Sequence, residues 1–92
     1  MSLAVRKDEG ASRYELVENG VVVGVAEYRV QGGAVVFHHT VIVPDRRGQG
    51  LGAVLVQGAL DDVRATGGTV VPVCWYVGEF IEAHSGYADL LA

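Results

Sequence analysis

Valine-rich runs separated by glycine turns fill the first half of the chain, a pattern typical of an antiparallel β-meander. Asn19-Gly20 is a strong signal for a two-residue hairpin turn, and Gly32-Gly33 marks the next turn. These signals predict strands over residues 12–17, 21–30 and 34–43, with residues 4–6 as a further strand at the edge of the sheet.

Side chains alternate between the two faces of a strand, so each predicted strand carries two sets of residues. In the longest predicted strand, alternation places Val23 on the face opposite Gly24. In the strand that follows, it places His39 on the same face as Phe37 and His38 on the other face.

The pattern changes after Pro44, which ends the meander because proline has no N–H to donate to a strand ladder. A helical period begins after Gly50, with a broad apolar face and a polar face marked by Gln57 and Arg64. Gly67-Gly68 is predicted to end this helix.

The rest of the chain adds one strand and a helical tail. A strand over residues 69–73 follows a crossover helix, so it should lie parallel to the strand ending at Val43. A short amphipathic helix is predicted over residues 76–84 and a final turn over 87–91. No repeat or linker divides the chain, so we expect one α+β domain over residues 1–92.

Composition narrows the class of protein. Half of the 92 residues are hydrophobic and 20% are charged, which suits one folded domain with a modest core. The net charge of −4 argues against nucleic acid as a partner. The longest apolar stretches, residues 21–26 and 70–78, are shorter than the roughly 18 residues that span a bilayer.

The cysteine and histidine content argues against disulfides and a metal site. A single cysteine cannot form an intrachain disulfide, and His38, His39 and His84 lack a recognised ligand spacing, so no metal is expected. The N-terminal residues lack the apolar core of a signal peptide. We therefore expect a cytoplasmic protein that does not bind membranes, either a monomer or a weak homodimer.

The segment Arg46-Arg47-Gly48-Gln49-Gly50-Leu51-Gly52 joins the last meander strand to the helix. The first N–H groups of a helix have no partner within the helix and can bind an anion. Glycines let phosphate oxygens approach the backbone, and an adjacent arginine adds charge-assisted hydrogen bonds. The segment therefore predicts a phosphate site, and the alternative is a flexible turn that caps a buried helix.

Two nucleotide-binding motifs can be set aside. A Walker loop requires Gly-Lys-Ser/Thr, which is absent. The spacing Gly48-x-Gly50-x-x-Ala53 satisfies the dinucleotide fingerprint, but that motif also needs repeated βαβ units and an acidic residue after the next strand. Here the 69–73 strand is followed by cysteine and tryptophan.

With these motifs excluded, Arg47-x-x-Gly50-x-Gly52 after a valine-rich strand resembles the signature of the GNAT N-acetyltransferase superfamily. In that superfamily the loop holds the pyrophosphate of coenzyme A, and the preceding strand pairs with the pantetheine arm. The resemblance implies acetyl-CoA as cosubstrate. It would be bound by the end of the strand and the loop, namely by Ile42, Val43, Arg46, Arg47, Gly48, Gln49, Gly50, Leu51 and Gly52.

The likeness extends to the small single-domain YjdJ-type branch, through His39-Thr40, the loop and Pro72-x-Cys74. It implies a minimal GNAT fold: an antiparallel meander, a CoA-binding helix, a parallel strand and a short C-terminal helix. Larger members have further helices and strands that build a substrate site. One departure is visible, since Pro44 stands one place later than in the usual His-Thr-Glu-Val-Pro, and the acidic residue is missing.

The resemblance implies an acetyl-CoA-dependent N-acetyltransferase whose acceptor is a small-molecule or protein amine. The alternative is a CoA or acyl-CoA binding module with little turnover. Cys74 is the sharpest candidate for chemistry, as an acetyl-accepting nucleophile, a proton carrier or a residue lining the thioester pocket. A buried inert cysteine is the alternative reading.

His39 is the second catalytic candidate, because pairing with Cys74 would follow the Cys–His arrangement of activated thiols. A lone histidine among apolar neighbours also fits a structural role. Trp75 and Tyr76 are expected to pack on the helix or to line the pantetheine channel, and core packing is the favoured position for Trp75.

Overall fold

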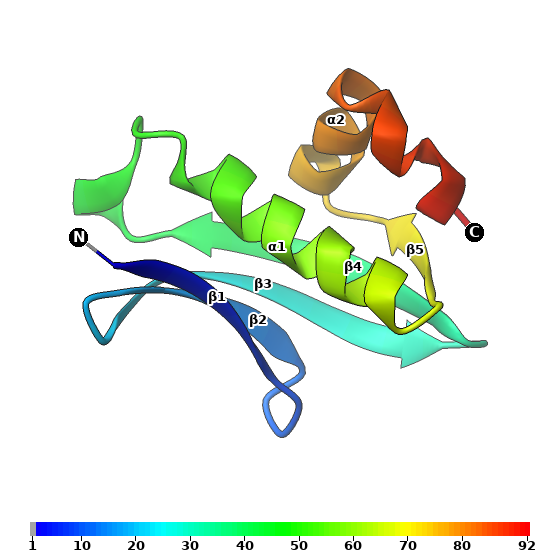
Figure 1. Cartoon of the computed structure of the whole chain (residues 1–92), viewed down its shortest axis with the longest axis horizontal. Helices are drawn as coiled ribbons and strands as arrows, with labels where there is room; N and C mark the ends of the chain where they lie inside the picture. Colours follow the sequence, from blue (N-terminus) through cyan, green and yellow to red (C-terminus); the bar gives the residue numbers. More distant parts are fainter. Residues whose placement is uncertain (1) are drawn as a thin grey trace.

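A computed structural model describes residues 2–92 as a five-stranded sheet with the strand order β1-β2-β3-β4-β5. Strands β1 to β4 pair antiparallel, and β5 runs parallel to β4 (Figure 1). The predicted meander, its parallel fifth strand and the α+β class are thereby confirmed. The strand bounds are Leu3–Asp8, Arg13–Glu18, Val21–Gln31, Ala34–Ile42 and Thr69–Pro72.

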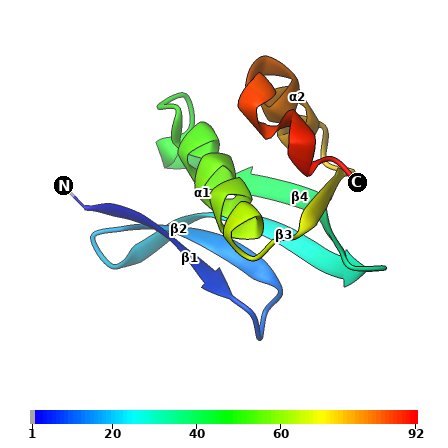
Figure 2. The same ribbon diagram turned by 45° about the vertical axis from the view of Figure 1, so that its right-hand side comes forward.

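Two α-helices and two 3₁₀ turns complete the fold. The turn η1 (Pro44–Arg46) precedes α1 (Leu51–Ala65), and α2 (Trp75–Ala83) precedes η2 (Ser85–Leu90). Helix α1 lies across one face of the sheet, and α2 lies beside it toward β5 (Figure 2). None of the helices within residues 2–92 is long and apolar enough to cross a membrane.

The core lies between α1, α2 and the sheet. The predicted apolar face of α1 is buried. Beneath it, a cluster of three aromatic rings, one from each of three strands, packs with ring centroids 5.5 to 6.2 Å apart. Those rings belong to Tyr14, Tyr28 and Phe37. The Tyr14 hydroxyl donates to Asp62 of α1 at 2.7 Å and so ties the helix to β2.

Strict alternation fails at two places, where the strand pairing shifts by one residue. In β3 the shift lies opposite Leu16 and Val17, and both Val23 and Gly24 then face the core. The predicted opposition of these two residues is therefore wrong. A β-bulge inserts an unpaired residue and turns the following side chains over, and propensity alone does not reveal it.

The second shift corrects the predicted face of His39. Tyr28 pairs with Phe37 and Glu27 pairs with His39, so His38 is the extra residue. Phe37 is buried, whereas His38 and His39 are both exposed. Directly paired residues point to the same side of a sheet, so His39 lies on the face of Glu27, away from Phe37.

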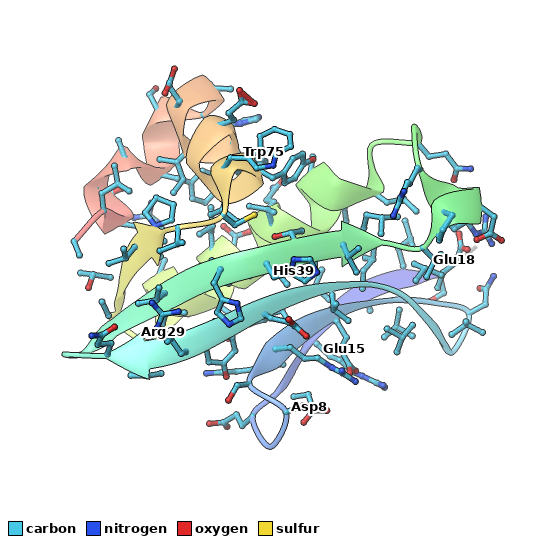
Figure 3. All side chains as sticks on the ribbon, turned by 180° about the vertical axis from the view of Figure 1, so that it is seen from behind. Asp8, Glu15, Glu18, Arg29, His39 and Trp75 are labelled. Carbon is cyan, nitrogen blue, oxygen red and sulfur yellow. The ribbon has the colours of Figure 1, made fainter. Side chains whose placement is uncertain are left out.

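The face opposite α1 carries a charged cluster instead of a helix (Figure 3). Glu15 of β2 is only 3% exposed, because Arg6 and Arg13 cover it and donate to its two oxygens at 2.7 and 2.8 Å. Hydrogen bonds from Arg6 and Arg13 outweigh burial and hold the pKa of this carboxyl below its usual range. This buried carboxylate is neutralised entirely within the sheet.

Helix α1 approaches the edge strand β1 closely at Gly58. A Cβ at this position would lie 2.6 Å from Val5 Cγ2, inside van der Waals contact. We predict that Gly58→Ala lowers the free energy of unfolding by about 1–3 kcal/mol through overpacking, measured by chemical denaturation. In a Val5→Gly background, which also removes the Val5 Cβ that would lie 2.7 Å from the added Cβ, the same change should be neutral or stabilising by up to about 1 kcal/mol, because alanine favours the helix. An equal loss in both backgrounds would contradict this account.

Candidate functional site

The site begins where β4 and β5 separate. Their pairing runs from Ala34 with Thr69 to Phe37 with Pro72 and stops there. The Val73 N–H turns back to Val71 O at 3.1 Å, and the Cys74 N–H donates to Phe37 O at 2.8 Å. Strand β4 continues to Ile42 without this neighbour, so its edge from His38 onward faces a gap.

The glycine loop forms one wall of this gap, between β4 and α1. Gly48 and Gly50 adopt left-handed backbone conformations, with φ of 79° and 76°. Gly50 is the N-cap of α1, and its side-chain-free backbone leaves the first N–H groups of the helix open toward the loop. The predicted strand–loop–helix order is confirmed, and the loop leads directly into a helix N-terminus.

A single cavity of about 360 Å³ links this loop to the separation of the strands. It brings together most of the predicted site residues, from the end of β4, the loop and the start of α2. Val43, Gln49 and His39 are not among the residues that line it. The lining residues are Thr40, Ile42, Arg46, Arg47, Gly48, Gly50, Leu51, Gly52, Cys74, Trp75 and Tyr76.

The two neighbouring arginines of the loop have different partners. Arg47 is exposed, and its Nε donates to the backbone oxygen of Ile42 at 3.0 Å, which leaves the other guanidinium N–H groups free of hydrogen bonds to the described residues. Arg46 forms an ion pair with Glu18 at the end of β2.

Cys74 lines the cavity and is the N-cap residue of α2. Its thiol donates to the Thr40 hydroxyl at 3.5 Å, and once the thiol is ionised the same hydroxyl can donate to the sulfur. Burial desolvates the thiol and raises its pKa, but hydrogen bonds from Thr40 and from the backbone N–H groups of Val77 and Tyr76 lower the pKa by more. The net pKa is below the usual value for cysteine, so the site favours the thiolate.

The side chain that contacts Cys74 is Thr40, and not the predicted partner His39. Thr40 pairs with Ala26 on the core side of the sheet, whereas His39 pairs with Glu27 on the opposite side. The bulge at His38 produces this exchange, because it moves Thr40 onto the face that a regular strand would give to His39. Figure 3 shows His39 on the part of β4 that lies in front of the helices in that view. Thr40 is next to His39 in the sequence, but strict alternation assigns it to the opposite face of the strand, so the sequence alone did not identify it as a site residue.

Two aromatic residues follow Cys74 at the start of α2. Tyr76 lies over the first turn of α1, where a Cβ at Gly52 would come 2.7 Å from its hydroxyl, so the third glycine of the loop provides the room for this ring. Trp75 packs edge-on against Tyr76 but is 72% exposed at the cavity mouth (Figure 3). The predicted core position of Trp75 is therefore wrong.

Metal-ligating side chains do not gather in this part of the molecule. Within residues 2–92 there is no group of three or more histidine, cysteine, aspartate or glutamate side chains that could hold an ion. The polar groups at the cavity are backbone N–H groups, arginine, threonine, tyrosine and one thiol.

Comparison with known proteins agrees with this geometry. A family model described as GCN5-related N-acetyl-transferase matches residues 13–90, from the start of β2 to the end of η2. No curated protein sequence matches the chain. The match covers most of the sequence, including β4, the glycine loop, β5 and Cys74. The chain therefore belongs to the GCN5-related N-acetyltransferase family.

Proposed function

We propose that this protein is an acetyl-CoA-dependent N-acetyltransferase that transfers an acetyl group to an amine. The observation that carries the proposal is the continuous cavity, which joins an anion-binding loop to an unpaired strand edge and a thiol of lowered pKa. Coenzyme A has the matching order of groups: a pyrophosphate, an amide-containing arm and a terminal sulfur.

The loop suits the pyrophosphate. The N–H groups of the first turn of α1 and the positive end of its dipole favour negative charge, and left-handed glycines remove side chains from the approach. Arg47 adds a cation that no carboxylate of residues 2–92 neutralises. Together these groups fit a doubly charged ligand better than a neutral one.

The free edge of β4 suits the pantetheine arm. From His38 to Ile42, β4 has no neighbouring strand on the side of β5. Because backbone N–H and C=O groups need hydrogen bonds, this edge can accept another partner. The two amides of pantetheine can supply them as an added strand would. Thr40 and Ile42 line the cavity along this path, and Cys74 lies at its end.

The proposed chemistry uses the Cys74 thiolate as an acetyl acceptor. The sulfur attacks the thioester carbonyl carbon, a new carbon–sulfur bond forms, and coenzyme A leaves as a thiolate that takes a proton from water. An uncharged amine then attacks the acetyl-cysteine, the amide bond forms, and Cys74 leaves as the thiolate. The proton that the attacking nitrogen loses as the amide forms goes to water and neutralises the hydroxide left when coenzyme A was protonated, so atoms and charges balance over the cycle.

The rival function is a module that binds CoA or acyl-CoA without transfer. It shares the loop and the free edge of β4 but gives no role to a thiol of lowered pKa at the end of the cavity. The acceptor we propose is a small-molecule or protein amine, since the net charge of −4 favours cationic partners.

The binding claim predicts a specific effect of Gly50→Ala. Holding alanine at a φ of 76° costs about 1–2 kcal/mol, so the loop will move away from its present conformation. We expect the affinity for coenzyme A, measured by titration calorimetry, to fall about tenfold.

The matched control for this variant is Gly33→Ala. Gly33 has a φ of 82° and, like Gly50, no atom within 4 Å of an added Cβ, but it lies in the turn between β3 and β4. Its stability loss should be similar and its affinity for coenzyme A unchanged. If wild type does not bind coenzyme A at millimolar concentration, or both variants lose affinity equally, the proposed site is wrong.

The lowered pKa of Cys74 predicts that its thiol is alkylated at lower pH than an ordinary cysteine. Only the thiolate reacts with iodoacetamide, so the rate should increase with a midpoint at lower pH than that of cysteine in a short unstructured peptide measured in parallel. Cys74 is the only cysteine, so mass spectrometry follows it without background.

Two variants locate the cause of this shift. Thr40→Val keeps the size of the side chain but removes a hydrogen bond that favours the thiolate, so the midpoint should rise. His39→Asn should leave it unchanged, because His39 lies on the other face of β4. If the midpoint shifts in His39→Asn and not in Thr40→Val, the result would contradict this account and support pairing of Cys74 with His39.

A further inference from the structure

Glu18 is the second buried carboxylate among residues 2–92, and it touches the loop. It lies at the end of β2 and is 5% exposed. Its Oε1 forms an ion pair with Arg46 Nη2 and accepts no hydrogen bond from the described residues. A buried charge is strongly unfavourable unless it is paired, so Glu18 commits Arg46 to this contact.

Arg46 belongs to the turn that begins the loop. Its N–H donates to Val43 O at 3.0 Å and the Arg47 N–H donates to Pro44 O at 3.4 Å, and these bonds form η1. The ion pair therefore joins β2 to the segment that connects β4 with Gly48. Figure 3 shows Glu18 beside this segment, whereas Glu15 lies farther along β2.

The next residue, Arg47, has no carboxylate partner among residues 2–92, in contrast to Arg46. Arg47 is exposed, lines the cavity and is bonded only to the backbone oxygen of Ile42 among residues 2–92. Both arginines line the cavity, but Arg46 is paired with an internal carboxylate, whereas Arg47 has no carboxylate partner among residues 2–92.

We propose that Glu18 is a positioning residue for the phosphate loop: its ion pair with Arg46 fixes η1 and the glycines behind it, and Arg47 is the arginine that binds the phosphate. The inference rests on the proposed binding of coenzyme A. It assigns Glu18 a role in a site that it does not line.

The test is the affinity of Glu18→Gln for coenzyme A by titration calorimetry. If the ion pair preorganises the loop, the neutral amide loosens it and affinity falls about tenfold. If Glu18 merely competes with the ligand for Arg46, releasing Arg46 adds a cation to the site and affinity rises. An unchanged or tighter affinity would overturn the proposal.

Glu15→Gln is the matched control. Glu15 is equally buried on the same strand and paired with arginines, but those arginines belong to β1 and β2. It should affect stability without changing the affinity for coenzyme A, and an equal loss of affinity in both variants would overturn the positioning role. Absence of binding by wild type would instead refute the proposed function.

A second measurement serves if Glu18→Gln does not fold. The double variant Glu18→Met, Arg46→Met removes both charges together, so it leaves no buried charge unpaired and keeps the net charge. Its weakened affinity should keep the salt dependence of wild type, because the proposal pairs the Arg46 cation with Glu18 and not with the phosphate. Arg47→Ala should lose part of that dependence, since salt screens a direct cation–phosphate contact. A loss of salt dependence in this double variant as large as in Arg47→Ala would overturn the proposal.

Discussion

Hydrogen bonding between β4 and β5 ends at Pro72, and the arrangement of the site depends on this break. Proline has no N–H to continue the ladder, Val73 turns back on Val71, and Cys74 makes the last contact to Phe37. Strand β4 continues beyond the break while the chain after β5 turns into α2. One edge of β4 is thereby left for another hydrogen-bonding partner, and the N-terminus of α2 lies opposite it.

The same break places two helix N-termini at one cavity. That of α1 lies behind the glycine loop and can face a phosphate, and that of α2 directs backbone N–H groups toward the Cys74 sulfur. Both favour negative charge, one on a bound ligand and one on a thiolate. A domain of 92 residues thus obtains much of its proposed chemistry from backbone groups.

Sequence patterns predicted the elements well because each has a local cause. Asn19-Gly20 predicted the first long hairpin, Gly67-Gly68 the end of α1, and the glycine loop its place between strand and helix. The faces of β3 and β4 were predicted less well. A bulge depends on pairing with a neighbouring strand, so nothing within β4 alone shows that Thr40, and not His39, reaches the side of Cys74. Trp75 was misplaced for a similar reason, since apolarity does not reveal that a residue stands at a cavity mouth.

The central claim is that the acetyl group of acetyl-CoA reaches Cys74. The most direct measurement is the intact mass of the protein after incubation with acetyl-CoA carrying a deuterated acetyl group. The account predicts one labelled acetyl group on wild type, none on Cys74→Ala, and its loss with amide formation when a reactive amine is added. Wild type that binds acetyl-CoA but shows neither the adduct nor release of coenzyme A would contradict it and identify a binding module instead.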